Sequence, residues 1–232
     1  MDSIDLSVVM PCLNEEKTVG NCIREAQKYI KDNGISGEII VVDNKSDDAS
    51  AKVAKRSGAR VLIQKRRGYG IAIRTGIRAA KGKVIIICDC DMTYDIYHLD
   101  DIYIPLKTGE YEVMIGDRLK NTDKGAMPLS HKIGGYMLSL LGRLRYHVDV
   151  RDFHCGLRGI TKEAVSRLEF RTEGMEFATE MIAEAAAADL LIGQTEVVLR
   201  RCPYDREPKL RTVRDGFRHL IFILAWRKDG RR

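Results

Sequence analysis

Short apolar runs alternate with amphipathic segments through the first part of the chain. Four runs have the length and the β-branched composition of buried strands, at residues 5–11, 37–43, 59–64 and 83–89. The segments between them have helical spacing, at residues 15–33, from the polar turn 44–50 to residue 57, and at 67–80. Continuously apolar strands that alternate with helices predict an α/β fold, with a mostly parallel, Rossmann-like sheet and helices on both faces. In such sheets, ligands bind beyond the carboxyl ends of the strands.

The pattern loosens after the fourth run, although elements can still be predicted. Residues 111–117 and 193–200 are expected to be strands, 128–146 and 176–188 to be helices, and 151–158 to be irregular. No linker or repeat divides the 232 residues, which are enough for one large α/β domain. We expect this domain to span residues 1–210 and to be followed by a helix and a basic tail at 211–232.

The predicted C-terminal helix, within residues 210–228, has two rows of side chains. One row is apolar and the other is basic; they consist of Leu210, Val213, Phe217, Leu220 and Leu224, and of Arg211, Arg214 and Arg218. An amphipathic helix with a cationic flank is suited to an anionic membrane surface. Packing of the apolar row against the core is the alternative interpretation, and one helix can do both.

Two carboxylates follow the fourth apolar run with one residue between them. Asp89 and Asp91 share a face if the strand geometry continues that far, because successive side chains of a strand point to opposite faces. Two neighbouring carboxylates repel each other unless a cation lies between them. Mg²⁺ or Mn²⁺ is bound typically by one or two carboxylates together with phosphate oxygens. The pattern therefore predicts a metal site, with a solvated turn as the alternative, and Asp43 at the end of the second run supports the metal site.

The glycine-rich segment 66–76, "RRGYGIAIRTG", begins like a dinucleotide-binding motif. Its third glycine position is Ile73, and the acid expected ~20 residues later is replaced by the aspartate cluster, so a dinucleotide fold is disfavoured. Gly68 and Gly70 let the backbone approach a ligand, and Arg67 is placed to face phosphate. The alternative is a helix N-terminus with flexible glycines.

Charge and cysteine content narrow the choice of partners and compartment. A net charge of +6 favours anionic partners such as nucleotides, phosphorylated lipids or membrane surfaces, and we expect no nucleic-acid partner. None of the six cysteines forms a C-x-x-C pair, so we expect no zinc site, reduced thiols and a cytosolic protein. The longest apolar run, 220–226, has seven residues, whereas a membrane-spanning helix needs ~20.

Taken together, these segments resemble family 2 glycosyltransferases of the GT-A fold, and among them the dolichyl-phosphate mannose synthase-like group. The motifs that carry the resemblance are "VVMPCLNEE" (8–16), "VVDNKSDD" (41–48), "RRGYGIAIRTG" (66–76) and "CDCDMTYD" (88–95). Later motifs resemble a bacterial and archaeal subgroup: "GDRLKNTDKGAMPLSHKIGG" (116–135), "DFHCGLRGI" (152–160), "GMEFATEM" (174–181) and "KLRTVRDGFRHL" (209–220). The chain departs from the family at Asn44-Lys45, at Thr93 and in the turn "YDREPK" (204–209).

The resemblance implies roles for individual residues. It places the nucleotide near Pro11, Leu13, Asn14, Glu15, Asp43, Arg67, Gly68 and Gly70, and the metal at Asp89 and Asp91, of which Asp91 is also catalytic. For an acceptor phosphate it implies Arg118, His131, Arg158 and Lys209. Asp152 is the candidate general base if the acceptor is a hydroxyl, and otherwise a buried structural partner of Arg158.

The reaction implied is a metal-dependent, inverting transfer of a hexose, either mannose from GDP-mannose or glucose from UDP-glucose. The expected acceptor is a polyprenyl or dolichyl phosphate at the cytosolic membrane face, with a small membrane-spanning subunit as a further partner. A phosphate monoester is already largely ionised at pH 7, so it needs cations rather than a base. The alternatives are transfer to a sugar hydroxyl of a glycan or glycolipid, and a catalytically silent nucleotide-binding subunit of a membrane complex.

Overall fold

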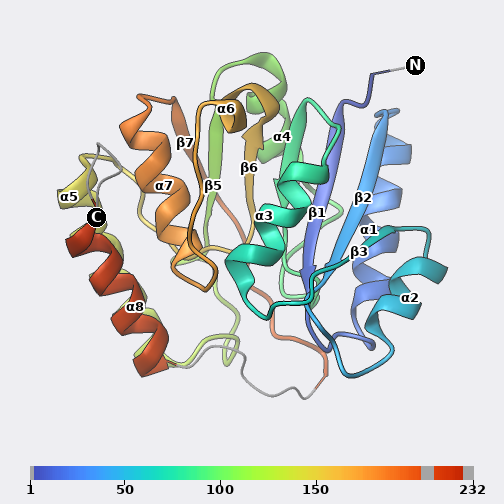
Figure 1. Ribbon diagram of the computed structural model, residues 1–232, viewed down its shortest axis with the longest axis horizontal. Helices are drawn as coiled ribbons and strands as arrows, with labels where there is room; N and C mark the ends of the chain where they lie inside the picture. Colours follow the sequence, from blue (N-terminus) through green and yellow to red (C-terminus); the bar gives the residue numbers. More distant parts are fainter. Residues whose placement is uncertain (1–2, 205–211, 227–232) are drawn as a thin grey trace.

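A sheet of seven strands forms the centre of the molecule, in the order β3-β2-β1-β4-β6-β5-β7 (Figure 1). The computed structural model describes residues 3–204 and 212–226. The strands are β1 (Leu6–Cys12), β2 (Gly37–Asp43), β3 (Arg60–Ile63), β4 (Val84–Ile87), β5 (Val113–Asp117), β6 (Arg158–Thr161) and β7 (Ile192–Glu196). Only β6 runs against its neighbours, since the other paired strands are parallel. The expected α/β fold with a mostly parallel sheet is confirmed.

Helices cover both faces of this sheet, with α3 and α7 on the near face and α1 and α4 on the far face of Figure 1. The helices are α1 (Val19–Asp32), α2 (Ser50–Arg56), α3 (Tyr69–Ala79), α4 (Asp100–Thr108), α5 (Leu129–Tyr146), α6 (Lys162–Ser166), α7 (Phe177–Ala187) and α8 (Thr212–Ala225). None of the helices in the described part of the chain is long and apolar enough to cross a membrane.

The register of the sheet brings distant chain segments to one edge. Cys12 at the end of β1 pairs with Asp43 at the end of β2. On the other side of β1, Val9 pairs with Ile87 at the end of β4. Because β6 is antiparallel, its first residue, Arg158, pairs with Ile87 at that same edge. The carboxyl ends of the parallel strands and the loop that precedes β6 therefore surround one region.

Two elements differ from the sequence-based expectation. Residues 151–158 were expected to be irregular, but Arg158 begins β6, which fills the gap between β4 and β5. The strand has only four residues and starts with a charged one, so it lacks the apolar run that indicates a buried strand. The helix α4 was not predicted and contains Pro105, a residue that argues against a helix interior.

The helix α8 packs against α5 and α7, but not with its apolar row, as the alternative interpretation of the sequence expected. Its buried residues are Asp215, His219 and Ile223, whereas Phe217 and Leu224 of that row are exposed. The polar contacts of the buried face explain the difference, since His219 Nδ1 lies 2.8 Å from the hydroxyl of Thr179 on α7. The predicted boundary at 210/211, and with it Leu210 and Arg211, lies outside the described residues.

Burial of His219 makes the docking of α8 sensitive to pH. Burial lowers the pKa of His219 to about 4, and its ring stacks edge-on against His154 with the centroids 4.5 Å apart. The folded protein therefore keeps this imidazole neutral, while the unfolded chain takes up a proton below about 6.5. Because the unfolded state then binds more protons, the contribution of His219 to stability is full above about pH 6.5 and is lost as the pH falls toward 4.

We expect His219→Gln to flatten the pH dependence of stability. Between pH 7 and pH 5 the wild-type protein should lose about 2 kcal/mol of unfolding free energy that the variant does not lose. Urea titrations at the two pH values measure this difference, with His147→Asn as the control at an exposed histidine. Equal losses in wild type and His219→Gln would show that this imidazole is not the group that titrates.

Candidate active site

The carboxylate pair lies in the turn after β4 rather than on the strand. Since β4 ends at Ile87, the alternation of strand side chains does not apply to Asp89 and Asp91, contrary to the expectation from sequence. The two groups nevertheless interact, because burial and the charge of Asp91 raise the pKa of Asp89 to about 6. The hydroxyl of Tyr69, in the first turn of α3, donates to Asp89 Oδ1 at 3.2 Å. Asp91 Oδ1 accepts the backbone N–H of Thr93 at 3.0 Å.

The third aspartate of this segment, Asp95, belongs to a different cluster. Its carboxylate forms ion pairs with Arg200 and, at 2.9 Å, with His98, and it accepts the backbone N–H of Tyr97 at 3.1 Å. Arg200 in turn donates its backbone N–H to the carbonyl of Thr93 at 2.8 Å. Asp95 thus connects the turn after β4 to the segment after β7. It does not belong to the carboxylate pair, which consists of Asp89 and Asp91.

The pair suits a divalent cation that is shared with a phosphate ligand. The described residues contain no group of three or more His, Cys, Asp and Glu side chains that could hold a metal. Two carboxylates completed by phosphate oxygens and water are a typical donor set for Mg²⁺ or Mn²⁺. A cation between them would also relieve the repulsion that raises the pKa of Asp89. Asp89 and Asp91 are therefore the residues of this chain that fit the expected metal.

A glycine after the Asp152 loop makes room for this pair. A Cβ atom at Gly156 would lie 2.1 Å from Asp89 Oδ2 and 3.1 Å from the ring of Tyr94. The chain before β6 therefore passes directly against the carboxylate, and any side chain at this position would displace it.

Two loops at the ends of β1 and β2, called the nucleotide-side loops here because the nucleotide is expected there, are joined by hydrogen bonds. The backbone N–H groups of Asn14 and Glu15 donate to the hydroxyls of Ser46 (3.0 Å) and Ser50 (2.7 Å), respectively. Glu15 is buried, and its carboxylate accepts the hydroxyl of Thr18 at 2.9 Å. Among the other residues expected here, Pro11 and Leu13 are half-buried and Asn14 is exposed.

Asp43 carries a buried oxygen without a hydrogen-bond partner. Its Oδ2 accepts the backbone N–H of Ser46 at 3.3 Å, while Oδ1 has no partner among the described residues. Leaving a buried polar atom unsatisfied costs about 1–3 kcal/mol. A donor on a bound ligand would satisfy this oxygen, which is the arrangement expected of a residue that contacts a base or a ribose.

Asn44, where the family often has aspartate, holds the glycine-rich loop. Its amide nitrogen donates to the carbonyl of Arg66, and its amide oxygen accepts the N–H of Gly68, both at 2.7 Å. A carboxylate at this position could accept but not donate. Asparagine in place of aspartate therefore adds a second hydrogen bond between the glycine-rich loop and the end of β2.

The glycines of this loop approach another part of the chain, whereas the sequence predicted that they approach a ligand. A Cβ at Gly70 would lie 2.8 Å from both the Phe177 side chain and the carbonyl of Thr172, and the N–H of Gly70 donates to the carbonyl of Gly174 at 3.1 Å. Arg67 forms an exposed ion pair with Asp47. The loop is thus fastened between the end of β2 and the chain before α7.

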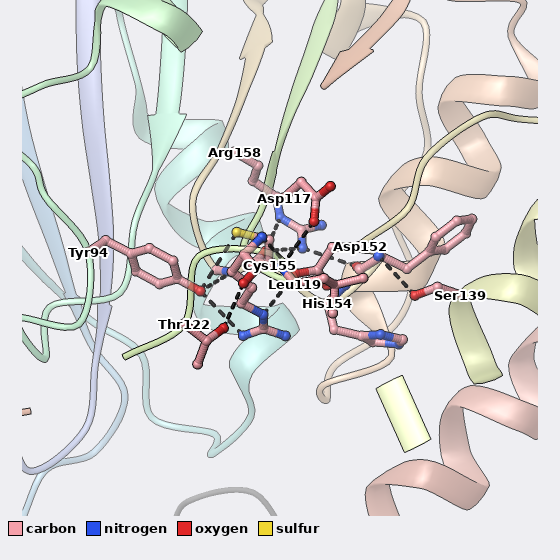
Figure 2. A network of polar contacts seen from close by, with 12 residues as sticks. Tyr94, Asp117, Leu119, Thr122, Ser139, Asp152, His154, Cys155 and Arg158 are labelled. Carbon is pink, nitrogen blue, oxygen red and sulfur yellow. Dashed lines mark hydrogen bonds and ion pairs between the residues drawn. The ribbon is translucent and has the colours of Figure 1, made fainter. Parts of the chain in front are cut away.

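Arg118, directly after β5, is held by Asp152 beside the carboxylate pair. Its Nε donates to Asp152 Oδ2 at 2.9 Å, and its Nη1 donates to the hydroxyl of Tyr94 at 3.3 Å. Asp152 is 2 % exposed, and its Oδ1 accepts the backbone N–H of His154 at 3.0 Å. Figure 2 shows this network around Tyr94 and Asp152. The charges of Arg118 and Arg158 both act to lower the pKa of Asp89, so both guanidiniums lie within electrostatic range of that carboxylate.

Arg158 has a structural position, which contradicts its expected role as a phosphate ligand. It is 1 % exposed, and its Nε and Nη1 donate to the carbonyls of Cys155 and Ala178, both at 3.0 Å. A third bond reaches the carbonyl of Phe153 at 3.3 Å. The expected pairing of Asp152 with Arg158 is also wrong, because Asp152 pairs with Arg118.

The other two expected phosphate ligands are not placed at the site by the contacts described. His131 lies in the first turn of α5, half-buried, and Lys209 lies outside the described residues. Sequence reasoning missed Tyr69 and Tyr94, whose hydroxyls contact Asp89 and Arg118. Their signal was their position inside motifs already singled out, "GYG" and "DMTYD".

Comparison with known proteins agrees with these motifs. A hexosyltransferase of low-salt glycan biosynthesis, Agl6 from Haloferax volcanii, is 34% identical over 222 residues, which cover 95% of this chain and 53% of the relative. The chain thus spans about half the length of that relative. A dolichyl-phosphate hexose transferase of the same organism is 30% identical over 198 residues, with 84% and 83% of the two chains covered.

A solved structure shows the same fold. Glucosyl-3-phosphoglycerate synthase from Mycobacterium tuberculosis, in complex with Mn²⁺, UDP and glucosyl-3-phosphoglycerate, matches with a TM-score of 0.75 at 22% identity. The match covers 96% of this chain and 80% of that one. This likeness confirms the GT-A architecture.

The family model of glycosyl transferase family 2 matches residues 7–168, a span that includes the carboxylate pair, the nucleotide-side loops and Asp152. Because this match extends over more than half of the chain, the chain belongs to glycosyl transferase family 2, as the resemblance of its motifs implied.

Proposed function

We propose that this protein transfers a hexose from a nucleoside-diphosphate sugar to the phosphate of a polyprenyl lipid, with Mg²⁺ or Mn²⁺ as cofactor. The observation that carries this proposal is the ion pair by which Asp152 holds Arg118 within electrostatic range of Asp89, a member of the carboxylate pair. The arrangement supplies a cation for an anionic acceptor and engages the carboxylate that would otherwise act as a base. The relative named a dolichyl-phosphate hexose transferase supports the same acceptor class.

On the donor side, the chain supplies acceptors for the nucleoside and a site for the diphosphate. Asp43 Oδ1 is available to a donor group of the base or the ribose, and Glu15 lies in the neighbouring loop. A cation at Asp89 and Asp91 would stabilise negative charge on the departing diphosphate. The structural neighbour with Mn²⁺ and UDP supports a uridine donor, while GDP-mannose remains the alternative that the sequence suggested.

On the acceptor side, Arg118 binds and orients the phosphate monoester. One phosphate oxygen attacks the anomeric carbon as the bond from that carbon to the diphosphate breaks, and the nucleoside diphosphate leaves. A single displacement of this kind inverts the anomeric centre. Because the phosphate is ionised at neutral pH, no proton has to be removed before the attack. The enzyme acts at the cytosolic membrane face in this proposal, and a membrane-spanning partner subunit stays a prediction.

We expect Asp91→Asn to reduce transfer by about 100-fold or more, because it weakens charge stabilisation of the leaving group. Nucleotide affinity, measured by calorimetry with and without Mn²⁺, should lose its dependence on the metal. The matched control is Asp95→Asn, four residues away in the separate cluster with Arg200. Turnover of Asp91→Asn at the wild-type rate would contradict the metal assignment.

Asp43→Asn should weaken nucleotide binding about tenfold, since a hydrogen bond to a charged group contributes ~1.5–3 kcal/mol. The dependence of nucleotide binding on Mn²⁺ should be the same in this variant as in the wild type. The exposed Asp123→Asn serves as the control for loss of one negative charge. If both variants bind the nucleotide equally well, Asp43 does not contact the donor.

The pair Arg118→Lys and Asp152→Asn separates the two acceptor classes. Arg118→Lys keeps the charge but loses the fork of donors, so transfer to a polyprenyl phosphate should fall while nucleotide affinity changes little. Asp152→Asn keeps an oxygen that can accept from Arg118, so its turnover should fall less than about tenfold, whereas loss of a general base costs 10²–10⁴-fold.

The pH profile of Asp152→Asn provides the second readout. A positioning role predicts a profile with the shape of the wild type, because Asp152 does not take up the reacting proton. Loss of the acidic limb together with near-complete loss of turnover, at unchanged nucleotide affinity, would replace the phosphate acceptor with a hydroxyl acceptor.

A further inference from the structure

The helix α5 exposes an apolar stripe along its whole length. Its large hydrophobic residues exposed to solvent recur at three- and four-residue steps and are Leu129, Ile133, Tyr136, Met137, Leu141 and Leu144. The opposite side carries the buried Ser139, Gly142 and Tyr146, which face the protein. A helix of a globular protein normally turns its apolar stripe to the core, so this outward stripe requires another explanation.

The neighbouring helix α8 carries a second row of exposed apolar side chains. Phe217, Ile221 and Leu224 lie on one side of α8 and are 61%, 61% and 69% exposed. The two helices are in contact and lie together at one end of the molecule in Figure 1. Their ends are linked, because Arg145 donates to the carbonyl of Trp226 at 2.9 Å. Nine of the fourteen large exposed hydrophobic residues in the described part of the chain belong to this α5–α8 face.

The exposed charges of the two helices are of one sign. The helix α5 contains no aspartate or glutamate, and its Lys132 and Arg145 are exposed. In α8, Arg214 is exposed and the acidic Asp215 is buried. An exposed acid next to α5, Asp149, is paired with Arg143 at 2.6 Å. An apolar stripe with exposed cations is the composition of helices that lie in the interface of an anionic bilayer.

We propose that the α5–α8 face docks on an anionic lipid bilayer, with the apolar residues of both helices inserted between the headgroups. The proposal rests on the proposed function, because a lipid acceptor has to be reached from the bilayer. It assigns to α5 the larger part of a surface that the sequence suggested for the C-terminal helix alone. The position of α5 agrees with this, since the chain runs from Arg118 at the end of β5 into α5.

Charge favours the bilayer over a second copy of the chain. In a two-fold symmetric dimer, the same face meets itself, so a face whose exposed charges are cations such as Lys132 and Arg214 would meet a face of the same sign. Like charges opposed across an interface weaken it, while anionic headgroups complement them. The docking therefore combines insertion, which is insensitive to salt, with an electrostatic part that salt screens.

Co-sedimentation with lipid vesicles tests the proposal. The vesicles contain phosphatidylcholine alone or mixed with phosphatidylglycerol, and the variants are Leu144→Glu on α5 and Ile221→Glu on α8. Ile63→Glu on β3 is the matched control, because Ile63 is as exposed as Ile221, at 61%. Wild type and control should bind the mixed vesicles, and each of the other variants should bind roughly tenfold more weakly. High salt should remove the gain from phosphatidylglycerol.

Transfer assays separate this proposal from the proposed function. With a short, water-soluble polyprenyl phosphate, Leu144→Glu and Ile221→Glu should turn over like the wild type, while transfer to a long acceptor embedded in vesicles should fall with binding. Absence of transfer to either acceptor in the wild type would contradict the proposed function and leave vesicle binding as a separate result. Vesicle binding of Leu144→Glu equal to that of the control would overturn the role of α5. Dimerisation of the wild type without vesicle binding, abolished by Leu144→Glu, would assign the face to a second copy.

Discussion

The buried guanidinium of Arg158 is the interaction on which the acceptor half of the site depends. Arg158 is the first residue of β6, the antiparallel strand of the described sheet. Its guanidinium donates hydrogen bonds to the carbonyls of Phe153, Cys155 and Ala178. A buried charge is tolerated only when it is fully hydrogen-bonded, so these carbonyls are held where the guanidinium needs them. The loop before β6 and the start of α7 are thereby fixed to each other.

That loop carries the two residues through which the site is shaped. Asp152 lies at its beginning and holds Arg118, and Gly156 lies at its end and contacts the carboxylate of Asp89. Removing Arg158 would therefore disturb both the cation and the carboxylate pair without touching either directly. Effects on activity at this position are consequently expected to report positioning rather than contact with phosphate.

The position of the donor-side residues in the fold was easier to predict from the sequence than that of the acceptor-side residues, for a physical reason. The strands that end at Cys12 and Asp43 are continuous apolar runs, and the polar residues after them had to gather at one edge of a parallel sheet. Arg118 and Arg158 are alike in the sequence, since each lies at one end of a short strand and inside a motif of the family resemblance. Only the packing of β6 between β4 and β5 separates the buried arginine from the one that faces the site.

The two outer helices show the same limit of periodicity. Helical spacing predicted their extent, with 128–146 matching α5 closely, but an amphipathic pattern does not say which solvent its apolar side meets. In α8 the face that packs on the protein includes the polar Asp215 and His219, because Thr179 offers a partner to the imidazole. The apolar residues Phe217, Ile221 and Leu224 therefore lie on the solvent-exposed side of α8. The chain that leaves β5 carries Arg118 and reaches α5 after residues 118–128. A lipid acceptor held at the α5–α8 face and the cation proposed to bind its phosphate would thus belong to one stretch of chain, which links the two proposals.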